Sequence, residues 1–268
     1  MARPHVELRG VTRIFAATAT TGAVAALGPV DLDIAAGELC AVIGPSGCGK
    51  STLMEIVAGL TRPSAGTISL EGRNVDGEIA DGVGVVFQED ATFPWLSARD
   101  NIAFGLQQSR LPRAEIDARV RHALELMGLS GFADAFPAQL SGGMRQRVCI
   151  ARTLVQRPRL ILLDEPFGAL DQQTRLLMGD ELVRLWRETG ATILLITHSL
   201  DEAAMLATRI AVMSARPGRI LEIVPTPWGE ERGSAVITDP RFGAVAAQLW
   251  RLLREESLRS LAGSELRR

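Results

Sequence analysis

The sequence predicts an α/β fold built around a parallel β-sheet. Two short apolar runs, RLILLD (159 to 164) and TILLIT (192 to 197), are flanked by segments of helical periodicity, as buried parallel strands are. A third apolar run, ELCAVI (38 to 43), leads through a glycine-rich loop into KSTLMEIVAGL (50 to 60), where Gly59 stands near the end of a helix. This strand–loop–helix unit and the two apolar runs predict the core.

Two longer helices are expected in the middle of the chain. One covers residues 113 to 127 and ends before Gly128, which suits a left-handed residue after a helix. Its apolar face consists of Ile116, Val120, Ala123 and Met127. The other covers residues 141 to 156, since Ser141 can cap its start and Pro158 cannot continue it.

The remaining elements lie toward the two ends of the chain. Ser199 and Glu202 have the spacing of a capping box, which predicts a helix running to Leu206. A mixed-charge helix is expected over 242 to 259, inside a C-terminal extension that begins at Pro225. Further strands are expected over 5–9, 31–34, 67–70, 83–87, 209–214 and 220–224.

Composition restricts the function. The formal net charge is -2, so no positive field is available to bind nucleic acid, and nucleic acid is not an expected partner. Three cysteines without metal-ligand spacing favour a reducing, cytosolic compartment. The longest uncharged stretch, Ile14 to Val30, consists largely of Ala, Thr and Gly and is too weakly apolar for a membrane span; no signal peptide is expected either.

The glycine-rich loop, GPSGCGKS, matches the pattern G-x-x-x-x-G-K-[ST] and lies between a strand and a helix. Several backbone N–H groups in a concave loop can hold polyphosphate, and side chains would block that approach. Lys50 is expected to reach the β- and γ-phosphates, and Ser51 to ligate Mg²⁺. Cys48 is either a small packing residue or an oxidation-sensitive thiol. The expected phosphate-binding residues are Gly44, Pro45, Ser46, Gly47, Cys48, Gly49, Lys50, Ser51 and Thr52.

A second motif, LILLDEP (160 to 166), ends an apolar strand with two carboxylates. Asp164 would lie at the carboxyl edge of the sheet, where it could contact Mg²⁺. Glu165 could orient and deprotonate an attacking water; alone it would be a surface residue at the start of a loop. The two motifs together favour the catalytic interpretation.

The segment LSGGMRQRV (140 to 148) completes a set of motifs that resembles the ABC-transporter ATPases. Their signature is LSGGQ, and Met144 stands here at the usual Gln position. By itself LSGGM could equally be a capped helix start, but it follows the phosphate loop and precedes LILLDEP along one chain. The resemblance extends from about Val6 to Val224.

The resemblance implies roles for single residues elsewhere. Gln88 matches the Q-loop glutamine that touches Mg²⁺, and His198 matches the switch histidine at the γ-phosphate; taken alone, each could be structural. Asp171, after Ala169 and Leu170, matches the D-loop. Phe15 matches the aromatic residue that stacks on adenine, although the family usually has Tyr and a core Phe is the alternative.

The resemblance also implies an architecture and an assembly. It implies a P-loop NTPase (RecA-like) core with an antiparallel β subdomain and an α-helical subdomain inserted at about 90–157. Residues 1–224 would form the ATPase domain and 225–268 the extension. ATP and Mg²⁺ would bind between two head-to-tail subunits, where Ser141, Gly142 and Gly143 of one meet the γ-phosphate held by the other.

Membrane permease subunits and, indirectly, an extracytoplasmic solute-binding protein are the other implied partners. The chain would lie peripherally on the cytoplasmic face of the inner membrane. Phe93, Trp95 and Leu96, just past Gln88, would form a permease docking groove, or else pack within the helical lobe. This stretch, SARPGRI (214 to 220) and the C-terminal tail resemble the importers of nitrate, sulfonates and taurine.

Two other classes are weighed against this interpretation. An ABC-type ATPase acting on ribosomes or DNA usually has tandem units, coiled coils or zinc-bearing insertions, and the sequence contains none of these. A P-loop kinase or GTP-binding switch is disfavoured by the signature motif, by the paired Asp164 and Glu165, and by the lack of a guanine-specifying NKxD sequence.

Overall fold

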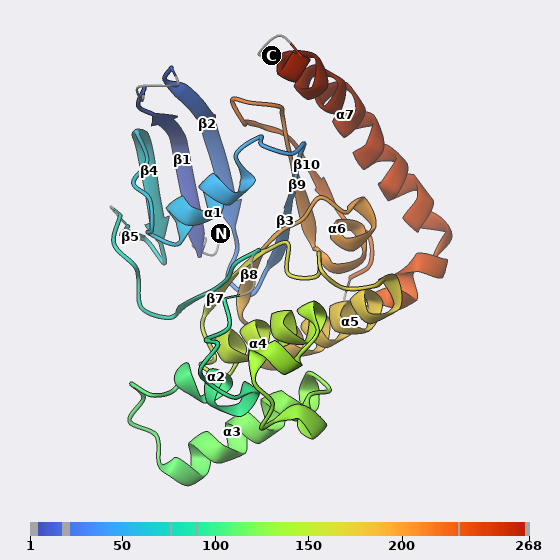
Figure 1. The fold of residues 1–268 in the computed structure, drawn as a ribbon. Helices are drawn as coiled ribbons and strands as arrows, with labels where there is room; N and C mark the ends of the chain where they lie inside the picture. Colours follow the sequence, from blue (N-terminus) through green and yellow to red (C-terminus); the bar gives the residue numbers. More distant parts are fainter. Residues whose placement is uncertain (1–4, 18–21, 76, 89–90, 230, 266–268) are drawn as a thin grey trace.

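Two β-sheets form the framework, and helices cover the larger sheet (Figure 1). The computed structural model describes residues 5–17, 22–75, 77–88, 91–229 and 231–265. The larger sheet contains, in order across it, β10 (Ile220–Pro225), β9 (Arg209–Met213), β3 (Leu39–Ile43), β8 (Thr192–Ile196), β7 (Leu160–Asp164) and β6 (Val83–Val86). All neighbours are parallel except β10 and β9.

The smaller sheet is antiparallel and lies beside the first helix. Its order is β2 (Val24–Ile34), β1 (Val6–Phe15), β4 (Ala65–Leu70) and β5 (Arg73–Asn74). The expected strands 5–9, 31–34 and 67–70 are therefore parts of longer ones. Because β1 pairs with β2 on one side and β4 on the other, weakly patterned residues are held as strand by their neighbours.

Seven α-helices are present in the described residues, with three short 3₁₀ segments, Ser130–Phe132, Pro137–Gln139 and Ser234–Thr238. The helices are α1 (Lys50–Val57), α2 (Ala98–Phe104), α3 (Arg113–Leu126), α4 (Gly142–Leu154), α5 (Gln172–Thr189), α6 (Leu200–Leu206) and α7 (Pro240–Glu265). In the part of the chain that the structure covers, no helix is long and apolar enough to cross a membrane. The predicted fold class is confirmed.

The central strands are apolar throughout because both faces of their sheet are covered. In β3, Leu39, Ala41 and Ile43 join one hydrophobic cluster, whereas Cys40 and Val42 join a second on the opposite face. The first cluster includes side chains of α4, α5, α6 and α7, and the second includes those of α1, β1 and β2. The same alternation in β7 and β8 explains the runs LILL and TILLI.

The helices α2, α3 and α4 come between β6 and β7 along the chain, and they lie together in space (Figure 1). Helix α4 packs against α2, α3 and β6, whereas α1 packs against β2, β7 and β8. Helix α7 is longer than the predicted 242–259 and packs on α6 and β9. Its Val245, Leu249 and Leu253 belong to the central core, so the C-terminal segment is part of one packed unit. The boundary at residue 224 stays a prediction.

Candidate functional site

The phosphate loop, residues 44–49, connects β3 to α1 at the carboxyl edge of the large sheet. Gly47 and Gly49 have φ angles of 72° and 109°, which favour glycine. The Lys50 side chain is folded back on the loop and donates hydrogen bonds to Gly44 O (2.9 Å) and Pro45 O (3.1 Å). Lys50 is 7% exposed, and it is the only lysine in the sequence.

Cys48 is buried beneath this loop. Its Sγ lies 4.0 Å from Lys50 Nζ, and burial raises the pKa of the thiol despite that nearby charge. Because the thiolate is the reactive form, a buried thiol with a raised pKa is a poor target for oxidation. Of the two interpretations of Cys48, the structure therefore supports the one in which it is a small packing residue.

Asp164 ends β7 on the same edge of the sheet as the phosphate loop. It is 5% exposed, and its Oδ1 has no hydrogen-bond partner among the described residues. Burial raises the pKa of Asp164, opposed by a hydrogen bond with Ser51. A buried carboxylate with an unpaired oxygen next to a serine hydroxyl is the kind of oxygen donor set that Mg²⁺ prefers.

No group of three or more His, Cys, Asp or Glu residues forms a metal cage in the described part of the chain. Magnesium commonly binds through one or two protein oxygens together with substrate phosphates and water. Asp164 and Ser51 fit that mode, in which the nucleotide completes the coordination.

Glu165 lies at the centre of a cluster of three predicted site residues. Its Oε2 is 3.1 Å from Gln88 Nε2 and 3.1 Å from His198 Nδ1. These residues follow three adjacent parallel strands, β6, β7 and β8, whose carboxyl ends meet at one edge. The structure thus brings Gln88, Glu165 and His198 together, although they are far apart in the sequence.

The backbone at Glu165 is strained. Its φ of 47° lies in the left-handed region, and its N–H donates to Ile196 O at 2.8 Å. Such a conformation in a non-glycine residue costs on the order of 1 kcal/mol and persists only where the surroundings enforce it. Here the hydrogen bond joins Glu165 to the end of β8, two residues before His198.

The loop after β8 is fixed by a buried carboxyl group. Thr197 Oγ1 donates to Glu202 Oε2 (2.9 Å) and accepts from the N–H of Ser199 (3.0 Å). Ser199 caps α6 by accepting from Glu202 N–H at 3.2 Å, as predicted. The reciprocal half of the capping box was predicted wrongly, because the Glu202 carboxyl group binds Thr197 instead. His198 is thereby held between two fixed residues.

Burial raises the pKa of Glu202 to about 7. Because the folded pKa exceeds the unfolded value of 4.5, the protonated form stabilises the fold fully below pH 4.5, and this contribution is lost as the pH rises through about 7. We expect Glu202→Gln to remove this pH-dependent loss of stability, because an amide does not ionise. The difference in free energy of unfolding between the variant and the parent should grow by about 2.5 kcal/mol from pH 5 to pH 8. Urea unfolding across this range measures it, and a constant difference would contradict it.

The signature segment caps a different helix. Ser141 Oγ accepts from Met144 N–H at 3.3 Å at the start of α4. A Cβ on Gly143 would lie 2.7 Å from Leu170 Cδ2, so the signature turn and the D-loop are in contact. Asp171 caps α5 and accepts from Thr174 N–H (3.0 Å) and Oγ1 (2.6 Å), and these hydrogen bonds lower its pKa.

Helices α4 and α1 lie in separate parts of the molecule (Figure 1). The signature residues Ser141, Gly142 and Gly143 begin α4, whereas Lys50 and Ser51 begin α1. The structure therefore assembles the phosphate loop, Asp164, Glu165, Gln88 and His198 into one site, with the signature segment on another surface.

Phe15 ends β1, opposite Val24 of β2. Its side chain is 39% exposed, and the Arg13 guanidinium lies 4.7 Å from its ring centroid. Phe15 is therefore a surface aromatic and not a core residue. Its stacking on adenine stays a prediction.

The aromatic residues after the Q-loop divide into two kinds. Phe93 is half-buried and contacts the rings of Trp95 (5.6 Å) and Phe104 (4.5 Å), with Arg152 over its face. Trp95 is 71% exposed. Phe93 thus packs within the helical lobe, whereas Trp95 presents apolar surface to solvent.

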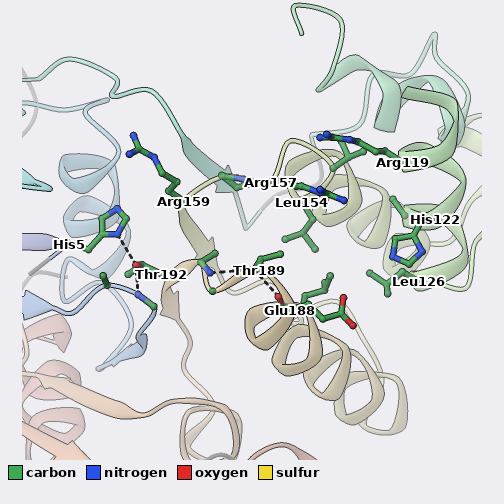
Figure 2. A pocket seen from close by; sticks show the side chains of 18 of the residues that line it. His5, Arg119, His122, Leu126, Leu154, Arg157, Arg159, Glu188, Thr189 and Thr192 are labelled. Carbon is green, nitrogen blue, oxygen red and sulfur yellow. Dashed lines mark hydrogen bonds between the residues drawn. The ribbon is translucent and has the colours of Figure 1, made fainter. Parts of the chain in front are cut away.

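A cavity of about 850 Å³ lies at the opposite edge of the sheet (Figure 2). It opens beside Arg159 and Thr192, where β7 and β8 begin, whereas the motifs lie where these strands end. Two of its arginines are already paired: Arg119 with Glu115 and Arg159 with Glu71. This cavity is separate from the site of the phosphate loop.

The sequence patterns did not predict the hydrogen bond between Thr197 and the Glu202 carboxyl group. They also indicated no role for Arg216, which lies beside the phosphate loop. The Arg216 Nε donates to Gly47 O at 3.0 Å. Nothing in the spacing of these residues predicts the contacts, because Arg216 and Gly47 are 169 positions apart. The segment SARPGRI (214 to 220) was noted for its resemblance to the importers, and its contact with the loop was not predicted.

The fold and the site define a P-loop nucleotide hydrolase: a glycine loop after one parallel strand, and acidic, amide and imidazole groups after its neighbours. The family model for ABC transporters matches residues 27–168. The chain belongs to this ABC transporter family, as an ATPase that binds ATP.

Relatives agree over most of the chain. The taurine import ATP-binding protein TauB of Pseudomonas aeruginosa is 46% identical over 84% of this chain and 87% of its own. The TauB of Roseobacter denitrificans is 42% identical over 90% of this chain and 91% of its own. An ABC transporter ATP-binding protein of Methanocaldococcus jannaschii is 41% identical over 96% of this chain and 94% of its own. The two taurine import proteins confirm the resemblance to importer ATPases.

Solved structures support the same class. A dimeric structure of the ABC transporter cassette MJ0796 has a TM-score of 0.74 and 31% identity, and it covers 82% of this chain and 98% of that one. The MJ0796 cassette dimer in a post-hydrolysis state, bound to ADP and phosphate, has a TM-score of 0.73 and 30% identity over the same shares.

Proposed function

We propose that this protein is the ATP-hydrolysing subunit of an importer that takes up a small solute such as taurine, another sulfonate or nitrate. The observation that carries the proposal is the meeting of Gln88, Glu165 and His198 at the sheet edge that holds the phosphate loop. The taurine import relatives support the solute class.

In this proposal the backbone N–H groups of residues 44–49 and the Lys50 ammonium bind the phosphates. Lys50 exchanges its two carbonyl partners for phosphate oxygens, and Thr52 lies in the first turn of α1, whose positive end faces the anion. Asp164 and Ser51, with Gln88, would hold Mg²⁺, which neutralises charge on the phosphate oxygens. Phe15 would stack on the adenine ring.

Glu165 is the proposed general base. Its carboxylate accepts a hydrogen bond from a water molecule and takes the proton as the water oxygen attacks the γ-phosphorus. The bond between that phosphorus and the oxygen bridging to the β-phosphate breaks, and ADP and inorganic phosphate leave. His198, beside Glu165 Oε2, is placed to donate to the γ-phosphate as charge develops.

The signature segment would complete the site of a second copy. Ser141 lies exposed at the N-terminus of α4, where free N–H groups and the helix dipole favour an anion. Since α4 and α1 lie apart in one chain, a head-to-tail homodimer brings Ser141, Gly142 and Gly143 of one subunit to the γ-phosphate on the other. Asp171, next to Leu170, would lie at the same interface. The dimeric MJ0796 structures support the formation of a dimer.

Mixing two inactive variants tests this assembly. Lys50→Ala disables the phosphate loop, and Ser141→Arg blocks the signature segment. In a head-to-tail pair of the two, one composite site retains an intact loop and an intact signature, so we expect ATPase activity to reappear on mixing. If each site were built within one chain, the mixture would stay as inactive as its parts.

The remaining proposed partners are membrane permease subunits and, through them, an extracytoplasmic solute-binding protein. The ATPase would lie peripherally on the cytoplasmic face of the inner membrane, with its helical lobe, residues 90–157, against the permease. Residues 1–224 are the proposed ATPase domain. Trp95 supports the docking surface, because an exposed aromatic beside the Gln88 loop can anchor a partner helix.

We expect Trp95→Ala to abolish most transport while basal ATP hydrolysis stays within about twofold of the parent, since Trp95 contributes surface and not core. Solute uptake and ATPase activity in vesicles with the permease measure both. Trp250→Ala is the matched control, because Trp250 is also exposed but lies on α7. Loss of basal hydrolysis in Trp95→Ala would instead indicate a packing role.

A further inference from the structure

The turn between β9 and β10, residues 214–219, lies directly on the phosphate loop. Arg216 Nε donates to Gly47 O at 3.0 Å, so a charged side chain fixes one peptide of the loop from outside. Ser214 closes the turn: its N–H donates to Arg219 O (2.9 Å) and its Oγ accepts from Arg219 N–H (3.1 Å). Arg216 therefore extends from a rigid support.

Gly218 of this turn joins β2 to the phosphate loop. Its N–H donates to Ala26 O and its carbonyl accepts from Gly28 N–H, both at 3.0 Å. A Cβ on Gly218 would overlap Cys48 O, and one on Gly49 would lie 2.8 Å from Ala26 O. Turn, strand and loop are thus in backbone contact, with no space for a side chain between them.

Helix α7 holds the turn from its other side. Ala215 N–H donates to Glu256 Oε2 at 2.7 Å, and Arg259 donates to Glu256 Oε1 at 2.6 Å. Glu256 is 4% exposed on a helix that is otherwise anchored by Val245, Leu249 and Leu253. The Glu256 carboxylate thus has two partners, Arg259 on its own helix and the Ala215 N–H of the turn, and a hydrogen bond to a charged acceptor is stronger than one between neutral groups.

We propose that the C-terminal helix positions the phosphate loop, with Glu256 and Arg216 as the positioning residues. In a trans peptide the C=O and the following N–H point in opposite directions. With Gly47 O bound by Arg216, the Cys48 N–H faces the other side of that peptide, where Pro45 O accepts it at 3.3 Å in place of a phosphate oxygen. The loop is therefore pre-organised to offer that N–H to a phosphate, and the ordering is done before nucleotide binds.

This inference rests on the proposed nucleotide function and predicts a specific kinetic pattern. Arg216→Ala should raise the Kd of ATP and of ADP about tenfold, the loss expected for one charge-assisted hydrogen bond. The kcat at saturating ATP should stay within about twofold, because Arg216 contacts the loop and none of the groups around Glu165. Thermal unfolding should change little, since Arg216 is exposed.

Variants at position 256 test the connection to α7. Glu256→Ala should weaken ATP binding about threefold, because an unheld Ala215 N–H loosens the turn. Glu256→Gln should restore binding, since an amide oxygen still accepts that N–H. Glu255→Ala is the matched control: Glu255 is exposed on the same turn of α7.

The double variant Arg216→Ala/Glu256→Ala should bind ATP as Arg216→Ala alone, because Glu256 acts through the turn. Three results would each overturn the inference. They are additive losses of ATP affinity in the double variant, an unchanged Kd in Arg216→Ala, and a Glu256→Gln variant that binds ATP no better than Glu256→Ala. The proposed function would survive these outcomes as long as the parent binds and hydrolyses Mg-ATP. A parent that binds no Mg-ATP would overturn the proposed function itself. Should Glu256→Ala fail to fold, the Kd of ATP in Arg216→Ala still decides.

Discussion

Replacing Glu165 by Gln is expected to lower kcat by about 10²- to 10⁴-fold while ATP binding stays within a few-fold of the parent. The amide keeps the shape of the side chain and can still contact Gln88 and His198, but it cannot take a proton from water. Bound ATP then persists. Since ATP is proposed to join two subunits, the variant should accumulate as an ATP-bound dimer.

Single-turnover hydrolysis and light scattering with Mg-ATP measure the two effects in the same preparation. Glu181→Gln is a suitable control, because Glu181 is a surface carboxylate on α5 that pairs with Arg184. A Glu165→Gln protein with parental turnover would remove Glu165 from the role of general base. A variant that is inactive and monomeric with Mg-ATP would retain that role but contradict the proposed dimer.

Replacing Lys50 by Ala should raise the Kd of ATP about 100-fold, since a buried ammonium loses its charge-assisted contacts with phosphate oxygens. Loss of the carbonyl contacts to Gly44 and Pro45 also frees the loop in the nucleotide-free state. Isothermal titration with ATP measures the change. Arg62→Ala is the control, since Arg62 carries the same charge and lies outside the phosphate loop.

Because Lys50 is the only lysine, a second measurement needs no mutation. An amine-selective acylating reagent can label only Lys50 and the terminal α-amino group, which serves as an internal reference. Mg-ATP should protect Lys50 and leave the reference unchanged. Equal labelling with and without Mg-ATP would contradict the proposed contact with phosphate.

The sheet edge that carries the proposed site was predictable because each of its motifs is local. The runs RLILLD and TILLIT are apolar since both faces of the sheet are covered, and parallel strands bring their carboxyl ends to one edge. Positions 164, 165 and 198 could therefore be placed near the phosphate loop from the order of strands alone. The strained φ of Glu165 could not, because it depends on a hydrogen bond to Ile196 of another strand.

Prediction was weakest where neighbours decide the structure. The strands 6–15 and 24–34 exceed the segments expected from their patterns because pairing between them stabilises residues with little strand preference of their own. The Glu202 carboxyl group accepts a hydrogen bond from the buried Thr197 hydroxyl, and not from the Ser199 N–H as the capping-box spacing predicts. The C-terminal segment was taken as an extension, yet its apolar face packs on the central core.

The sequence by itself determined the α/β class, the phosphate loop and the identity of the acidic, amide and imidazole groups, because periodicity and motif spacing are properties of contiguous residues. Only the tertiary structure decided that Gln88 and His198 both meet Glu165, that the signature helix lies away from its own phosphate loop, and that Arg216 reaches that loop from a turn bound by Glu256. Those contacts join residues separated by tens to hundreds of positions, and only the packing of whole elements brings such residues together.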